Sequence, residues 1–137
     1  MPIGLQLVRT AKVLSRAFDD ALAAAGGTLA TWLVMISLKS QRLGNQRELA
    51  EAIGIQGATL THHLNAMEAD GLVTRQRDPA NRRIHRVELT ERGETVFRQL
   101  RSAAAAFDRR VRAGISEQEV ATLEGLLDQL RHNVDAS

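Results

Sequence analysis

The 137-residue sequence lacks cysteine, has two prolines and contains only 3% aromatic residues. Without cysteine the chain cannot form disulfides, thiolate metal sites, cysteine nucleophiles or thiol-based redox sensors. No hydrophobic run approaches the roughly 20 residues of a membrane-spanning helix, and the N-terminus has no signal-peptide pattern. We therefore expect a cytoplasmic protein with no membrane partner, whose core is built from aliphatic residues.

Sequence patterns typical of enzymes are also missing. The chain has no G-x-S-x-G nucleophile elbow, no P-loop, no H-E-x-x-H zinc motif and no dinucleotide-binding fingerprint. Its four histidines suggest no nucleophile–base pair, and the adjacent His62 and His63 would project in different directions from a helix. We expect no catalytic residue, no metal site and no cofactor.

The net charge of +2 is small, although the sequence pI is 9.9. The pI overstates how basic the chain is, because tyrosine and cysteine are absent and only Lys12 and Lys39 titrate near pH ~10. The placement of the charge is more informative, since one short stretch gathers Arg75, Arg77, Arg82, Arg83, Arg86 and Arg92. A local basic patch of this kind favours nucleic-acid binding.

Hydrophobic residues at helical spacing predict helices over about 5–25, 29–40 and 91–112, and a last helix that continues to about 133. Thr28, Thr90 and Ser116 precede three of them as N-caps. The first helix has enough apolar surface to need a partner, which is either its own domain or a second subunit. The residue pattern favours neither.

Two shorter helices are predicted in the middle of the chain. Asn45 and Glu48 fit a capping box, and Gly54 ends the first helix. The second helix covers 57–70 and places Leu60, Leu64 and Met67 on one inward stripe. Its other face is small or hydrogen-bonding and contains no acidic residue near the start, so it could approach a base-pair edge. A helix pair with a tight turn predicts a helix-turn-helix.

A basic β-hairpin follows this pair. Residues 72–77 and 83–89 alternate as strands do, and residues 78–81 form a turn cluster between them. A helix pair followed by a basic hairpin is typical of a winged helix-turn-helix. The predicted fold class is therefore mainly α (α+β), with a small hairpin as the wing.

The chain resembles the MarR family of bacterial transcriptional regulators. The resemblance is carried by QRELAEAIG at 46–54, TLTHHLNAMEADGLV at 59–73 and RDPANRRIHRVELTERG at 77–93, together with Trp32. The chain departs from the family pattern at three positions. Family members often have Ser or Asp where this chain has Gln56, Arg where it has His62, and Asp where it has Asn81.

The resemblance implies one MarR-type domain over 1–137, with dimerisation helices at about 5–25 and 91–134 and a winged helix-turn-helix at about 29–90. It implies a homodimer that binds a pseudo-palindromic operator in double-stranded DNA, most often as a repressor. It also implies that a small aromatic or amphipathic effector can lodge between the dimerisation helices and the DNA-binding part.

Residue roles follow from this arrangement. Thr59, Thr61 and His62 are the candidate base readers, flanked by Gln56, Ala58 and Asn65, while Gln46 and Arg47 are candidate phosphate contacts. Arg83, at the hairpin tip, is the candidate minor-groove contact. Phosphate contacts or internal ion pairs are predicted for Arg75, Arg77, Arg82 and Arg86, with Asp78 orienting one of them.

Two alternatives remain open at this point. The protein could act mainly as a small-molecule sensor, with a candidate pocket formed by Phe18, Trp32, Met35, Ile36, His63 and Met67, all of which could equally be core residues. For His63, a half-buried, hydrogen-bonded state is favoured over a contact with DNA. The protein could also be an architectural DNA binder, which would bind random and operator DNA equally well.

Overall fold

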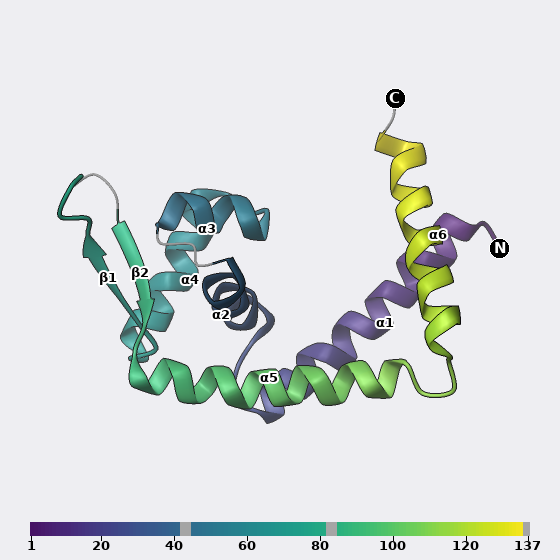
Figure 1. The fold of residues 1–137 in the computed structure, drawn as a ribbon, viewed down its shortest axis with the longest axis horizontal. Coiled ribbons are helices and arrows are strands. Elements are labelled where there is room, and N and C mark those ends of the chain that lie inside the picture. Colours follow the sequence, from purple (N-terminus) through teal and green to yellow (C-terminus); the bar gives the residue numbers. More distant parts are fainter. Residues whose placement is uncertain (42–44, 82–84, 136–137) are drawn as a thin grey trace. The chain divides into compact units, whose positions relative to one another are not determined.

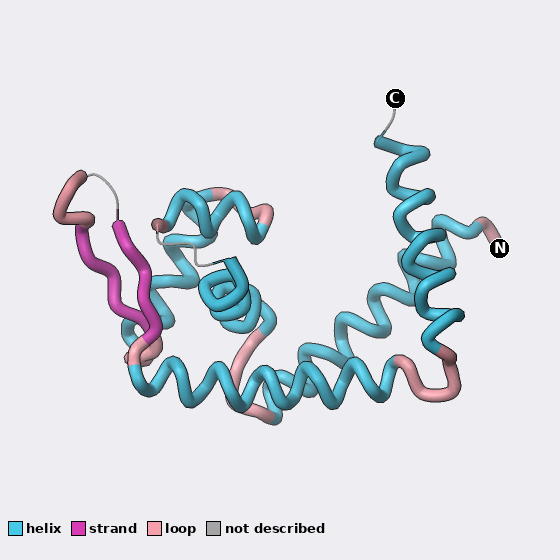
Figure 2. The backbone as a smooth tube through the Cα atoms, in the orientation of Figure 1, coloured by secondary structure: helices cyan, strands magenta, loops and turns pink. Residues whose placement is uncertain are grey.

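The computed structural model describes residues 1–41, 45–81 and 85–135, which form a mainly helical fold with one antiparallel hairpin (Figure 1; Figure 2). This confirms the predicted fold class. The elements are α1 (Ile3–Ala24), α2 (Leu29–Gln41), α3 (Gln46–Ile53), α4 (Gly57–Ala69), β1 (Val73–Arg77), β2 (His85–Leu89), α5 (Glu91–Val111) and α6 (Glu117–Asp135).

The chain divides into two compact units, Met1–Ala104 and Ala105–Ser137. The first unit contains α1 to α4, the hairpin and most of α5, and it holds the hydrophobic core. Leu60 and Leu64 of α4 are fully buried in this core and Met67 is 3% exposed, so the predicted inward stripe is confirmed. The other buried core residues are Leu22, Trp32, Val34, Met35, Leu38, Leu49, Ala50, Leu72, Val73, Val87, Phe97 and Leu100.

Local capping explains where the helices begin. The Thr31 N–H donates to Thr28 Oγ1, and the Gly93 N–H donates to Thr90 Oγ1. Before α6, Ser116 and Glu119 exchange two hydrogen bonds of 3.0 and 3.1 Å, as a capping box requires. The predicted N-caps of these helices are therefore confirmed.

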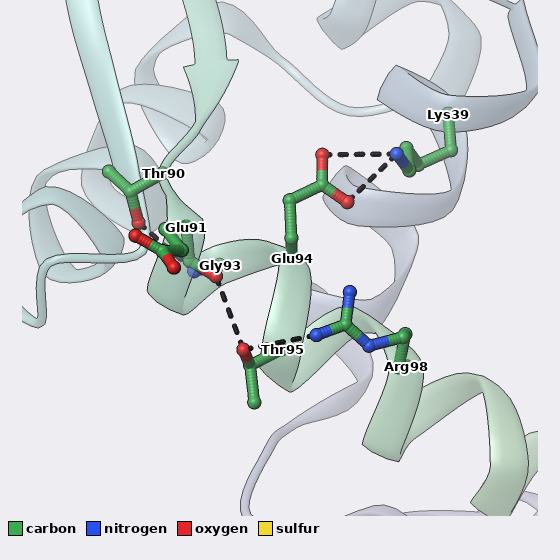
Figure 3. A network of polar contacts seen from close by, with 7 residues as sticks. All are labelled: Lys39, Thr90, Glu91, Gly93, Glu94, Thr95 and Arg98. Carbon is green, nitrogen blue, oxygen red and sulfur yellow. Dashed lines mark hydrogen bonds and ion pairs between the residues drawn. The ribbon is translucent and has the colours of Figure 1, made fainter.

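The start of α5 is fixed to α2 by an ion pair between Lys39 and Glu94 (Figure 3) and by an aromatic contact. Lys39 Nζ lies 2.8 Å and 3.0 Å from the two carboxylate oxygens of Glu94. The Phe97 ring stacks on Trp32 with centroids 5.8 Å apart, and Lys39 lies 5.6 Å from the Phe97 centroid. The helix that follows the hairpin is thus joined directly to the core.

Two helices, α1 and α6, expose apolar side chains. Leu22 is the one residue of α1 that is buried, and no residue of α6 is buried within its described span Glu117–Asp135. The exposed apolar residues of these two helices are Ile3, Leu5, Val8, Val13, Leu14, Leu123, Leu126 and Val134. Across 1–41, 45–81 and 85–135, no single helix could span a membrane, and the bent pair α1–α2 passes the length and composition test only jointly.

A substitution at Gly93 tests how closely the backbone of α5 approaches that of the residue before the hairpin. A Cβ at Gly93 would lie 2.1 Å from the Leu72 carbonyl oxygen, which is backbone and cannot rotate away. Gly93→Ala should therefore lower the free energy of unfolding by about 1–3 kcal/mol or more, measured by urea denaturation.

Gly57→Ala is the matched control, because nothing lies within 4 Å of the Cβ that it adds at the start of α4. We expect it to be neutral or to stabilise the protein by up to about 1 kcal/mol. Equal stability of the Gly93→Ala and wild-type proteins would contradict the close approach of the two backbones.

Candidate nucleic-acid interface

A tight turn sets α3 against α4. Gly54 ends α3 with a φ of 80°, in the left-handed region that residues with a Cβ rarely adopt, and its N–H donates to the Ala50 carbonyl oxygen. Asn45 begins α3 by accepting from the Glu48 N–H at 2.8 Å, so the predicted cap is confirmed. Gln56 precedes α4 without a side-chain capping bond. The two helices form the predicted helix-turn-helix.

The surface of α4 that faces away from the core carries most of the candidate base readers. Gln56, Ala58, Thr59, His62 and Asn65 are all exposed. None of these five residues is acidic, and the one acidic residue of α4, Glu68, is paired with Arg75. The stripe of buried residues on the opposite side fixes which side chains remain accessible.

Thr61 and Gln46 contact each other instead of extending into solvent. The Thr61 hydroxyl donates to the Gly57 carbonyl oxygen at 2.9 Å and accepts from the Gln46 side-chain amide at 2.7 Å. Its single proton is therefore used within the protein. The sequence did not anticipate this link between α3 and α4, and the predicted DNA contacts of both residues stay predictions.

The two arginines of β1 share a face of the hairpin and differ in exposure because Arg77 lies further along the strand toward the turn. Arg75 lies opposite Val87, and Arg77 lies opposite His85. Cross-strand partners share a face of the sheet, so Arg75 points to the same side as the buried Val87. The Arg75 side chain is 18% exposed, whereas Arg77 beyond it is exposed.

Two of the hairpin arginines form ion pairs within the chain. Arg75 Nη2 lies 3.0 Å from Glu68 Oε1, and this hydrogen bond and charge hold the pKa of Glu68 below its ordinary value. Arg86 Nε lies 3.2 Å from Asp78 Oδ2. The pKa of Asp78 is lowered chiefly by the Ala80 N–H, which donates to it at 2.8 Å, and next by Arg86. Arg82 and Arg83 lie outside the described residues.

An open groove of about 1000 Å³ joins these elements. Its lining comes from α3, from the start of α4 and from Asn81 of the hairpin turn, and includes Gln46, Arg47 and Thr61. A β-bridge between Asn45 and Arg86 connects the beginning of α3 to β2. The sequence did not predict the groove or the presence of Glu48 and Glu51 in its lining, because only the tertiary fold brings the turn beside α3.

The candidate effector pocket lies in the hydrophobic core. Trp32, Met35 and Met67 are buried in this core, and Phe18 and Ile36 are partly buried side chains that pack against it. His63 is half-buried, with its ring centroid 5.8 Å from that of His62. The groove described above is lined by other residues, so the pocket assignment stays a prediction.

The geometry defines the class of protein. A short helix pair with a left-handed glycine at its turn, followed by an antiparallel hairpin with basic side chains, is a winged helix-turn-helix. The arrangement places a polar helix surface and guanidinium groups on the same unit, which suits a nucleic-acid ligand.

Comparison with known proteins supports this class and gives the family. The model of the MarR family matches residues 28–85. The transcriptional regulator PA3341 is 30% identical, with a TM-score of 0.81 over 99% of this chain and 100% of that one. The chain therefore belongs to the MarR family, whose members are transcriptional regulators, and the sequence-based resemblance is confirmed.

Two further solved structures are similar over almost the whole chain. The transcriptional repressor CouR, bound to a 23-mer DNA duplex, is 25% identical with a TM-score of 0.85, over 95% of this chain and 92% of that one. CouR from Rhodococcus jostii RHA1, bound to p-coumaroyl-CoA, is 26% identical with a TM-score of 0.78, over 93% of this chain and 90% of that one.

The internal role of Thr61 can be tested without DNA. Thr61→Val keeps the shape of the side chain but removes the bonds to Gly57 and Gln46. We expect it to lower the free energy of unfolding by about 0.5–1.5 kcal/mol, measured by urea denaturation. The exposed Thr59 provides the control, since Thr59→Val should change stability by less than about 0.5 kcal/mol. Equal stability of the two variants would show that the Thr61 hydroxyl makes no internal contribution.

Proposed function

We propose that the protein is a sequence-specific, double-stranded-DNA-binding repressor that acts as a homodimer and responds to a small molecule. The observation that carries the proposal is the exposed surface of α4 from Ala58 to Asn65, which has no acidic residue and lies on the same unit as an arginine-bearing hairpin. The 13 residues of α4 span about 20 Å, and an α-helix fits the major groove of B-DNA.

In this arrangement the residues divide by the part of DNA that they contact. Thr59 and His62 are free to hydrogen-bond base edges, and the methyl groups of Ala58 and Thr59 can contact thymine. Arg47 and Arg77 are exposed and suit phosphate contacts. We retain Arg83 as the minor-groove contact on the basis of its place in the sequence.

The homodimer is supported by apolar surface that one copy leaves uncovered. Val8 and Val13 of α1 are 52% and 68% exposed, and Leu126 of α6 is 57% exposed. A second copy covers such surfaces by symmetry, and two recognition helices one helical turn apart then match a pseudo-palindrome. The 23-mer duplex bound by CouR is a ligand of the kind that we propose.

Selection from a random DNA pool tests the DNA-binding proposal. We expect enrichment of a roughly two-fold symmetric site that binds at least about 10³-fold more tightly than random DNA at the same salt concentration. Binding should weaken steeply as salt increases, since phosphate contacts release counterions. Equal affinity for selected and random DNA would favour the architectural alternative and contradict the proposal.

The ligand response rests on the p-coumaroyl-CoA complex of CouR and on the aliphatic and aromatic core described above. We propose that Phe18, Trp32, Met35, Ile36, His63 and Met67 surround the effector. Because Trp32, Met35 and Met67 are buried, the effector must separate packed side chains and would shift the population toward a state that no longer fits DNA.

A thermal-shift screen with aromatic acids, phenols and p-coumaroyl-CoA tests the response. A compound at about 100 times its Kd should stabilise the protein by about 2.7 kcal/mol and raise Tm by several degrees. The same compound should release selected DNA in a competition assay. A flat Tm across the library with unchanged DNA binding would contradict the sensor role.

A further inference from the structure

We propose that Arg75 is a positioning residue for base recognition: it binds the side-chain oxygen of Asn65, so that Asn65 presents only its amino group to DNA. The inference rests on the proposed function and adds to it the kind of base that this helix surface reads. Arg75 Nη2 donates to Asn65 Oδ1 at 2.5 Å and to Glu68 Oε1 at 3.0 Å.

The chemistry of the groups fixes the orientation of the amide. A guanidinium has donors and no acceptor, so the atom of Asn65 that faces it must be the oxygen. The amino group of Asn65 is then directed away from Arg75. Asn65 itself is exposed on α4, three residues after His62 and on the polar surface that the buried stripe leaves accessible.

The charge of Arg75 is already neutralised within the protein. Its side chain is 18% exposed and paired with Glu68, which lies one helical turn after Asn65 on the same side of α4. The lowered pKa of Glu68 agrees with a carboxylate that stays ionised beside this guanidinium. Arg75 is therefore used to hold α4, and exposed Arg77 is the arginine of β1 that suits a phosphate contact.

An amide that offers only donors distinguishes between bases. Guanine and thymine present acceptors at the polar atoms of their major-groove edges. Adenine presents an amino group beside its acceptor, and cytosine presents an amino group, and each amino group needs an acceptor. The usual two-bond contact of asparagine with adenine uses both the oxygen and the amino group. With its oxygen bound to Arg75, Asn65 should favour guanine or thymine at its position in each half-site.

The experiment compares the base preferences of variants by selection from a random pool, followed by competition binding. Asn65→Ala identifies the position that Asn65 reads. The double variant Arg75→Met/Glu68→Gln releases the amide while it conserves net charge. Asn65→Asp replaces the donor with an acceptor at an exposed site where folding is not at risk. Arg77→Gln is the control, because it removes a cation from the same strand without a contact to Asn65.

The wild-type protein should select guanine or thymine at the Asn65 position, and the double variant should lose about three- to tenfold of that preference by accepting adenine. Asn65→Asp should shift the preference toward cytosine. Arg77→Gln should weaken binding to all sequences and lower the salt slope by about one, with the preference intact.

The inference is overturned if the double variant behaves like Arg77→Gln, because Arg75 would then be a phosphate contact. It is also overturned if Asn65→Ala alters no position or if the wild-type protein selects adenine there. In each of these outcomes the wild-type protein still selects a consensus site, so the proposed function stands. If the DNA that the wild-type protein selects has no consensus, the proposed function is contradicted as well.

Discussion

Burial of one stripe of α4 is the constraint from which the rest of the interface follows. Leu60, Leu64 and Met67 insert into the core and thereby fix the rotation of the helix about its axis. The position of each outer side chain around the helix axis, relative to that stripe, then decides whether it is accessible or bonded within the protein. The Thr61–Gln46 contact fastens the outer edge of α4 to α3, and the Arg75 contacts fasten its other end to β1.

The polar residues of this region have two different uses. Some stabilise the geometry: Arg75 pairs with Glu68, and Arg86 pairs with Asp78. Others, including Thr59, His62 and Arg77, remain exposed and are available to a ligand. A count of basic residues in the sequence therefore overestimates the positive charge that DNA can contact, because ion pairs within the protein neutralise part of that charge.

The sequence predicted those features that depend on local chemistry. Helix starts at Thr28, Asn45, Thr90 and Ser116 follow from side chains that bond a backbone N–H three residues away, and the stripe of α4 follows from helical periodicity. The sequence could not predict that Thr61 would bond Gln46 or that Arg75 would bind Asn65, because these contacts depend on how separate elements pack. Ligand entry into the core, and pairing of α1 and α6 with a second copy, likewise depend on other molecules. The pattern of residues along one chain does not determine them.

In the proposed dimer, two copies hold their recognition helices at a separation that matches the pitch of duplex DNA. The most direct measurement is the affinity for a selected operator into which five base pairs, about half a turn, are inserted between the half-sites. We expect this insertion to reduce the affinity toward that of random DNA. An insertion of about one full turn returns both half-sites to the same face of the duplex and should reduce the affinity less than half a turn does. Affinity that is independent of the spacing would contradict a rigid symmetric dimer.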